Sequence, residues 1–252
     1  MRFEFAPGTV VLVGGGPGDP GLMTVAGLSA IQQADVIVHD RLGPLELLDE
    51  AADGAEVINV GKIPRGAYTP QEEINRLLVD RAQQGLRVVR LKGGDNYVFG
   101  RGGEEWLACA EAGVPVRVIP GVTSAVSVPA MAGIPVTHRS LSQGFCVVSG
   151  HVAPDDERSA VDWGALARCG LTIVILMGVH NLNHIADALI AGGMEPGTAA
   201  AVVADGTTPG QRTIRSRLDR VSNEAAGADV RPPAIVVVGA VAGLTLNARE
   251  PD

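Results

Sequence analysis

Only two lysines occur in the 252-residue chain, and each lies next to glycine at the end of an apolar segment. Lys62 ends the segment Val-Ile-Asn-Val-Gly-Lys, and Lys92 lies in Arg-Leu-Lys-Gly-Gly-Asp. Lysine supplies a point charge and a proton whose pKa can be tuned, whereas arginine does not readily release its proton. This placement indicates proton chemistry or precise positioning of charge. A codon bias toward arginine would explain the same count.

Composition excludes several classes of protein. The chain is 46% hydrophobic and has 33 glycines, as in α/β proteins with a large core and many tight turns. Its net charge of −8 argues against a nucleic-acid surface. No apolar segment reaches membrane-spanning length, and the N-terminus lacks the pattern of a signal peptide. The three cysteines show no metal or disulfide spacing. We therefore expect a cytoplasmic protein with reduced thiols and no membrane contact.

Short apolar segments alternate with helical patterns in the first half of the chain. Strands are expected at 10–13, 36–39, 57–60, 87–91 and 116–119, and helices at 21–33, 70–84 and 103–112. Thr69 and Glu72 have the spacing of a capping box before the second helix, and Gly85 is expected to end it. Alternation of strands and helices predicts a mostly parallel sheet.

A second series of strands is expected at 145–149, 171–177, 200–203, 212–216 and 234–238. We place the division between two α/β lobes near Arg139, with residues 1–139 in the first and 140–252 in the second. Each lobe is expected to hold a mostly parallel or mixed sheet flanked by helices. A cleft between two lobes is a common place for a ligand.

The glycine-rich segment 14–21 contains a Gly-x-Gly-x-x-Gly pattern, and Asp40 follows at the distance of a ribose-binding acid. A pyrophosphate needs backbone N–H donors at the helix start, which Pro17 and Pro20 lack. Asp19 adds negative charge at the same place. We favour a rigid turn lining a cleft for a ligand without phosphate. A turn that binds nothing and a dinucleotide-dependent oxidoreductase remain alternatives.

Motifs along nearly the whole chain then resemble one family. They are Gly-Gly-Gly-Pro-Gly-Asp-Pro at 14–20, Val-His-Asp-Arg-Leu at 38–42, Val-Gly-Lys at 60–62, Gln-Glu-Glu-Ile-Asn at 71–75, the block at 90–105, Pro-Gly-Val-Thr-Ser-Ala at 120–125, Gly-Ile-Pro-Val-Thr-His-Arg at 133–139, Leu-Met-Gly at 176–178 and Asp-Gly-Thr at 205–207. The set resembles the uroporphyrinogen-III C-methyltransferases of the tetrapyrrole methylase superfamily, and the 90–105 block is its most specific part.

The resemblance implies two α/β lobes, usually as a homodimer, with S-adenosylmethionine bound in the cleft between the lobes. It implies methylation of uroporphyrinogen III at C2 and C7, which gives precorrin-2 for sirohaem or cobalamin and S-adenosylhomocysteine. The chain shows no dehydrogenase–chelatase segment of the fused sirohaem synthases, so we expect a stand-alone methyltransferase. The chemistry needs no metal. The helical spacing of His180 and His184 is therefore interpreted as a surface or packing feature.

The resemblance also implies site residues. Asp40 matches the proposed proton acceptor and Lys62 the proposed proton donor, and we assign Arg101 to substrate binding or proton handling. Cofactor contacts are expected from Pro17, Gly93, Gly94, Asp95, Val98, Thr123, Ser124, Met177, Ala201 and Gly206. Because the substrate carries eight carboxylates, loop arginines are substrate candidates, with Arg41 and Arg139 chosen and Arg65 also considered. Alternatives are a salt bridge from Asp40 to Arg41 and plain core packing for Met177.

Two positions depart from the family pattern. Asn96 stands where proline is usual, and Tyr97 where phenylalanine is common. A proline restored at 96 is expected to be neutral or stabilising if the turn is preserved. Two further alternatives remain: another precorrin methyltransferase of the superfamily, and a non-catalytic protein that binds the cofactor or a tetrapyrrole.

Overall fold

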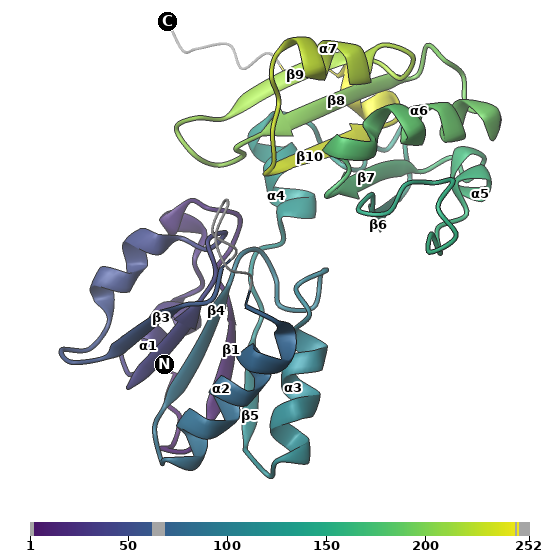
Figure 1. The fold of residues 1–252 in the computed structure, drawn as a ribbon. Coiled ribbons are helices and arrows are strands. Elements are labelled where there is room, and N and C mark those ends of the chain that lie inside the picture. Colours follow the sequence, from purple (N-terminus) through teal and green to yellow (C-terminus); the bar gives the residue numbers. More distant parts are fainter. Residues whose placement is uncertain (1–2, 62–68, 245, 247–252) are drawn as a thin grey trace, which may run out of the picture. The chain divides into compact units, whose positions relative to one another are not determined.

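The computed structural model describes residues 3–61, 69–244 and 246, which form two compact units (Figure 1). The units are Met1–Thr123 and Ser124–Asp252, so the division falls before the expected position near Arg139. The reason is helix α4 (Ser124–Met131), which packs against strands β7 (Thr172–Leu176) and β10 (Ala234–Val238) of the second unit.

The first unit is built on a five-stranded sheet in the order β3-β2-β4-β1-β5. Its strands are β1 (Val10–Gly14), β2 (Val36–His39), β3 (Glu56–Asn59), β4 (Val88–Lys92) and β5 (Val116–Ile119). All four pairings are parallel, which confirms the predicted sheet type. The carboxyl ends of the strands therefore meet at one edge, where ligands of open α/β sheets bind.

Helices cover both faces of this sheet (Figure 1). Strand residues alternate in direction, so Leu12 packs toward α2 (Gln71–Gln83) and α3 (Gly102–Glu111), whereas Val11 and Val13 pack toward α1 (Val25–Ile31) and η2 (Leu45–Glu50). Burial on both faces explains the mainly apolar character of β1, β2 and β4, whereas the edge strands β3 and β5 are partly exposed.

Two helix starts differ from the predictions. The first expected helix is divided, because Pro20–Leu22 forms a separate 3-10 turn (η1) and the Thr24 side chain caps α1 by accepting from Gly27 N. The expected capping box before α2 is wrong: Pro70 is the N-cap residue, and it provides no side-chain hydrogen bond. The predicted end of α2 is confirmed by Gly85, whose φ of +81° suits glycine.

The second unit contains a mixed sheet in the order β6-β7-β10-β8-β9. Its other strands are β6 (Phe145–Ser149), β8 (Ala199–Ala204) and β9 (Arg212–Arg217). Only the β6–β7 pair is parallel. One core cluster joins the sheet to α5 (Trp163–Ala167), α6 (Leu182–Ala191) and α7 (Val221–Gly227), and short turns η3 (Val179–Asn181) and η4 (Ala240–Gly243) complete the unit.

At the carboxyl edge of the first sheet, three loops touch through their backbones. Gly16 and Gly94 form an isolated antiparallel bridge, in which Gly94 N donates to Gly16 O at 2.6 Å and Gly16 N donates to Gly94 O at 3.1 Å. A Cβ atom on Gly121 would overlap the carbonyl oxygen of Gly94 and lie 2.6 Å from the carbonyl carbon of Gly14. The loops after β1, β4 and β5 therefore pack as closely as glycine allows.

Asn96 joins the same edge through its side chain. Its Nδ2 atom donates to Leu12 O at 3.2 Å and to Ile119 O at 2.9 Å, so one amide joins the middle of β1 to the end of β5. The residue has no exposed surface, and its Oδ1 atom is buried without a partner among the described residues. In this chain the side chain thus contributes directly to loop position, which the sequence did not suggest.

We expect Gly121→Ala to lower the free energy of unfolding by about 1–3 kcal/mol, because the added methyl group overlaps backbone that cannot move aside easily. Chemical denaturation followed by circular dichroism would measure the change. Gly103→Ala is the matched control, since a Cβ there meets nothing within 4 Å in α3. Equal stability of the two variants would contradict the close packing of the three loops.

We expect Asn96→Pro to lower the free energy of unfolding by about 1–2 kcal/mol, because two hydrogen bonds of about 1 kcal/mol each are lost while one unpaired oxygen is removed. This reverses the expectation from the sequence alone. Thermal unfolding would measure the effect, with the neighbouring Tyr97→Phe, which alters an exposed ring, as control. A proline variant at least as stable as the wild type would show that the amide contacts contribute nothing.

Candidate active site

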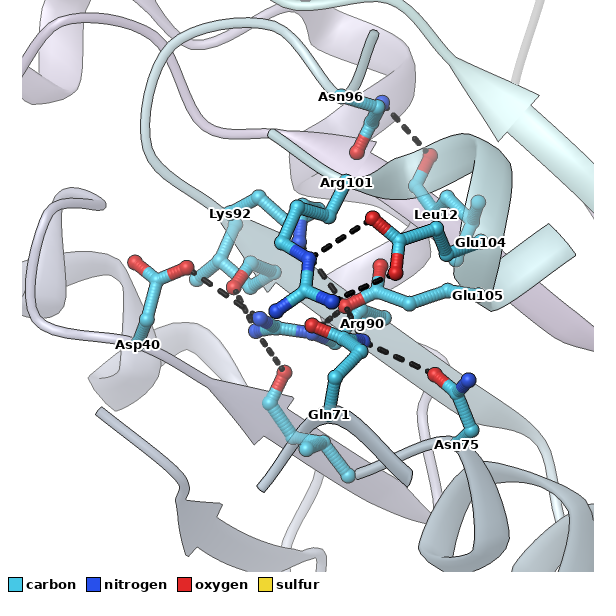
Figure 2. Close-up of polar contacts among 12 residues, drawn as sticks. Leu12, Asp40, Gln71, Asn75, Arg90, Lys92, Asn96, Arg101, Glu104 and Glu105 are labelled. Carbon is cyan, nitrogen blue, oxygen red and sulfur yellow. Dashed lines mark hydrogen bonds and ion pairs between the residues drawn. The ribbon is translucent and has the colours of Figure 1, made fainter. Parts of the chain in front are cut away.

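A buried group of charges lies beneath the carboxyl edge of the first sheet (Figure 2). Arg90 and Lys92 project from the same face of β4, and Glu105 comes from α3. The Oε1 atom of Glu105 accepts from Arg90 Nε and from Lys92 Nζ, each at 2.9 Å. The exposed fraction is 3% for Arg90, 4% for Lys92 and 0% for Glu105. We call Arg90, Lys92 and Glu105 the β4 ion cluster.

Neighbouring elements hold the cluster in place. The α2 residue Gln71 approaches Glu105 Oε1 with its Nε2 atom at 3.4 Å and donates to Asn75 Oδ1 at 2.9 Å. The Nη1 atom of Arg90 donates to the Leu91 carbonyl at 2.9 Å. Charge partners and hydrogen bonds must replace the water of a buried carboxylate, and strand and helix provide both at Oε1, whereas Oε2 is buried without a hydrogen-bond partner among the described residues.

Asp40 lies where β2 ends, next to this cluster (Figure 2). Its Oδ1 atom accepts from Leu42 N at 3.0 Å, and its Oδ2 atom lies 3.4 Å from Arg90 Nη2. The side chain keeps 25% of its surface exposed, so one carboxylate is both anchored and open to a ligand. The structure pairs Asp40 with Arg90 rather than with Arg41, which had been considered from the sequence.

Lys92 is electrostatically unusual. Burial lowers the pKa of its ammonium group, and the charge of Arg90 acts in the same direction. Glu105 and Asp40 oppose this by favouring the charged form. The protonation of Lys92 is therefore linked to the charges of two carboxylates, one buried and one at the edge.

Arg101 is the N-cap residue of α3 and has a strained backbone conformation. Its φ is +58°, in the left-handed region that non-glycine residues seldom adopt, and Phe99 two residues earlier has a φ of +56°. The guanidinium holds Glu104 through two bonds, from Nε at 2.8 Å and from Nη2 at 2.6 Å. These bonds lower the pKa of Glu104. Backbone strain retained in this way is common at functional sites.

The first unit also carries six of the expected cofactor residues, and four of them are held close together. Pro17 follows the Gly16–Gly94 bridge, and Gly93, Gly94 and Asp95 continue the loop after β4. Val98 and Thr123 lie in the adjoining segments of the same unit.

Asp95 helps to build the loops themselves. Its Oδ1 atom accepts from Tyr97 N at 2.9 Å, and its Oδ2 atom accepts from Gly121 N at 3.0 Å. Each carboxylate oxygen has a further lone pair, so these bonds leave acceptor capacity for a ligand amine or hydroxyl. Asp95 is therefore both a structural link and a candidate contact.

The glycine-rich turn after β1 does not fit a pyrophosphate. The Asp19 carboxylate accepts from Gly21 N at 2.7 Å and so occupies the start of η1 with its own negative charge. Pro17 and Pro20 provide no N–H donors. These facts support a ligand without phosphate, such as a sulfonium, and weaken the dinucleotide alternative.

The second unit carries the other four expected cofactor residues. Met177 follows β7 with a φ of +57° and 47% of its surface exposed, so the core-packing alternative is wrong. Gly206 lies so close to the Val128 side chain that a Cβ atom would overlap it. Ser124 begins α4. Ala201 is wholly buried within β8, so it presents no surface to a ligand in this structure, and we omit it from the proposed site.

The expected substrate arginines lie on exposed segments. Arg41 follows Asp40 directly in the first unit. Arg139 belongs to the second unit, where it lines a hollow of about 380 Å³ with the segment 140–143 and residues 169–171. Lys62 and Arg65 lie outside the described residues, so the proposed proton donor at Lys62 stays a prediction.

The described residues hold no cluster of His, Cys, Asp and Glu that could bind a metal ion. His184 lies 3.8 Å from Asp155, and both side chains are exposed. Burial raises the pKa of the Cys109 thiol to about 11, with the Glu105 charge acting in the same direction, so this thiol stays protonated. In the part of the chain that the structure describes, no helix is both long and apolar enough to cross a bilayer.

Sequence reasoning missed Arg90 and Glu105. A signal for Arg90 existed, because it alternates with Lys92 on one face of an otherwise apolar, central strand. Two cations on a buried face require an anionic partner. Nothing in the sequence identifies that partner as the second glutamate of the Glu-Glu pair in α3.

Comparison with known proteins identifies the family to which these motifs and this fold belong. The family model of the Tetrapyrrole (Corrin/Porphyrin) Methylases matches residues 9–222. A Methanocaldococcus jannaschii protein named uroporphyrinogen-III C-methyltransferase is 48% identical over 93% of this chain and 96% of its own length. A siroheme synthase of Zymomonas mobilis is 45% identical, and this chain spans 50% of its length.

Two solved structures extend the likeness. A Thermus thermophilus uroporphyrin-III C-methyl transferase, complexed with S-adenyl homocysteine, is 41% identical with a TM-score of 0.78, covering 92% of this chain and 98% of its own. A cobalt precorrin-4 methyltransferase is 26% identical with a TM-score of 0.84, covering 94% and 97%. By its motifs, its two α/β units and the matched family model, the chain belongs to the tetrapyrrole methylases.

Proposed function

We propose that this protein transfers methyl groups from S-adenosylmethionine to C2 and C7 of uroporphyrinogen III, giving precorrin-2 and S-adenosylhomocysteine. The observation that carries the proposal is the anchored, partly exposed Asp40 carboxylate, which lies at the carboxyl edge in a methylase with two C-methyltransferase relatives of similar length. Carbon methylation releases a proton, and this carboxylate is placed to accept it.

The residues of the first unit fit the donor. When bound, S-adenosylmethionine supplies an activated methyl group on a positively charged sulfur. Gly93 and Gly94 let the backbone approach a ligand closely, and Asp95 keeps acceptor capacity for an amine or hydroxyl. No phosphate cradle is needed, in agreement with the Asp19 carboxylate at the start of η1.

Side chains of this protein account for proton transfer and for binding of the tetrapyrrole. Asp40 accepts the proton that leaves the macrocycle. Arg101, held by Glu104, presents guanidinium donors of the kind that recognise carboxylates in pairs. Arg41 and Arg139 are further candidates for the eight carboxylates of the substrate, and Lys62 for proton donation. Orientation of the reacting carbon supplies much of the acceleration in such a displacement.

The alternatives are weaker on specific grounds. A later precorrin methyltransferase fits less well, because the related cobalt precorrin-4 enzyme shares 26% identity against 37–48% for the C-methyltransferases. A non-catalytic role would leave unexplained why Asp40 and Arg101 are both held in place. The siroheme synthase relative supports delivery of the product to sirohaem, with cobalamin as a second destination. A cytoplasmic homodimer completes the proposal.

The function can be tested by mass-resolved turnover. Anaerobic incubation with S-adenosylmethionine and freshly generated uroporphyrinogen III should give a product heavier by two methyl groups, with one S-adenosylhomocysteine per methyl group. Mass spectrometry would measure both. Cofactor binding without methyl transfer would indicate the non-catalytic alternative, whereas transfer only to a later precorrin would indicate the other enzyme class.

We expect Arg101→Lys to lower kcat/KM for the tetrapyrrole by tenfold or more, because lysine keeps the charge but loses the paired donors. KM for S-adenosylmethionine should change little. Steady-state kinetics would measure both. Arg158→Lys is the matched control, since Arg158 also holds a nearby exposed carboxylate, Asp156, through two bonds. Equal kinetics for the two variants would remove Arg101 from the site.

A further inference from the structure

We propose that the β4 ion cluster acts as a positioning device that holds Asp40 as an ionised, oriented carboxylate and restores that state between the two methyl transfers. Arg90, Lys92 and Glu105 are positioning residues in this account and need not touch substrate. The inference rests on the proposed function, because it takes Asp40 as the proton acceptor.

The first argument is the balance of charge. With Lys92 protonated, two cations face one buried carboxylate, so the cluster has one positive charge in excess. Asp40 is the carboxylate that meets this excess, at 3.4 Å from Arg90. Glu104 on α3 also lies within electrostatic reach of Lys92, but it is paired with Arg101. Charges in a poorly solvated site are weakly screened, so the excess positive charge of the cluster attracts the negative charge of Asp40 strongly.

The second argument is orientation. Asp40 is fixed at one oxygen by Leu42 N and approached at the other by Arg90 Nη2. Arg90 is fixed in turn, because its Nε donates to Glu105 and its Nη1 donates to the Leu91 carbonyl. The guanidinium therefore has little freedom to follow Asp40, and the carboxylate is held at a defined place on the sheet edge.

The third argument concerns the two successive transfers. In each transfer a carbon–carbon bond forms, the sulfur keeps the electron pair of the broken carbon–sulfur bond, and one proton leaves the macrocycle for Asp40. Protonated Asp40 no longer balances the excess charge of the cluster. That proton must pass to water before the second transfer, and the positive charges of Arg90 and Lys92 lie on the side of the site that Asp40 faces.

The pH dependence of kcat tests the proposal. We expect Lys92→Met to shift the acidic limb of the profile to higher pH by about half a unit or more, because the excess charge that favours the carboxylate is gone. A protonated Asp40 cannot accept a proton, so activity is lost sooner as the pH falls. Lys92→Arg keeps the charge and should leave the limb at its wild-type position.

Arg87→Met is the matched control. Arg87 directly precedes β4 and is paired with Asp35 at 3.6 Å, with more than a third of each side chain exposed. The residue lies about 16 Å from Lys92 along the same strand, at about 3.3 Å per residue. Its replacement removes the same charge from the same unit and should not move the acidic limb.

Thermal unfolding would establish that each variant is folded, and Lys92→Gln, which can still donate to Glu105, serves if Lys92→Met does not fold. A lower kcat without a shifted limb would show a merely structural role for Lys92 and overturn the proposal. So would a Lys92→Arg profile like that of Lys92→Met, because the charge alone would then not suffice. Absence of methyl transfer by the wild-type protein would instead refute the proposed function.

Discussion

The burial of one carboxylate organises the first unit. Glu105 has no exposed surface, and the effective cost of burying such a charge is several kcal/mol unless cations and hydrogen bonds replace water. Arg90 and Lys92 meet this need from β4, and Gln71 contributes from α2. Because these bonds join the sheet to both helices of one face, they fix where α3 starts. The position of Arg101 at that start follows from them.

The opposite side of the same loop is fixed by hydrogen bonds to backbone groups. The Asn96 amide, the Asp95 carboxylate and the backbone of Gly94 connect the loop after β4 to the ends of β1 and β5. A loop anchored at both ends can retain left-handed residues at Phe99 and Arg101, since each such residue costs about 1–3 kcal/mol that the anchors must offset. The strain and the anchoring are thus two aspects of one arrangement.

The sequence predicted the parts of this arrangement that are local or repeated. Alternating apolar segments gave the strands and the parallel sheet, and the motif at 90–105 indicated the family. The charge partners could not be predicted, because Arg90 meets Glu105 and Asp40 only after three elements have packed. The contribution of the Asn96 side chain could not be predicted for the same reason, because its bonds reach Leu12, far along the chain. The predicted capping box of α2 was wrong, because Pro70 is the N-cap residue and provides no side-chain hydrogen bond.

The glycine loops form the edge of the sheet, and the charged side chains placed at that edge differ in role from them. This difference explains how one scaffold serves several methylations. A parallel sheet with closely packed glycine loops supplies an edge at which a flat ligand can approach backbone, whatever the macrocycle. Fold likeness therefore does not rank substrates, since fold and function are carried by different residues. The preference for one substrate over another depends on the charged side chains placed at that edge. In this chain the charges at that edge are Asp40 and the β4 ion cluster, and we propose that their balance keeps Asp40 available as the base for both methylations.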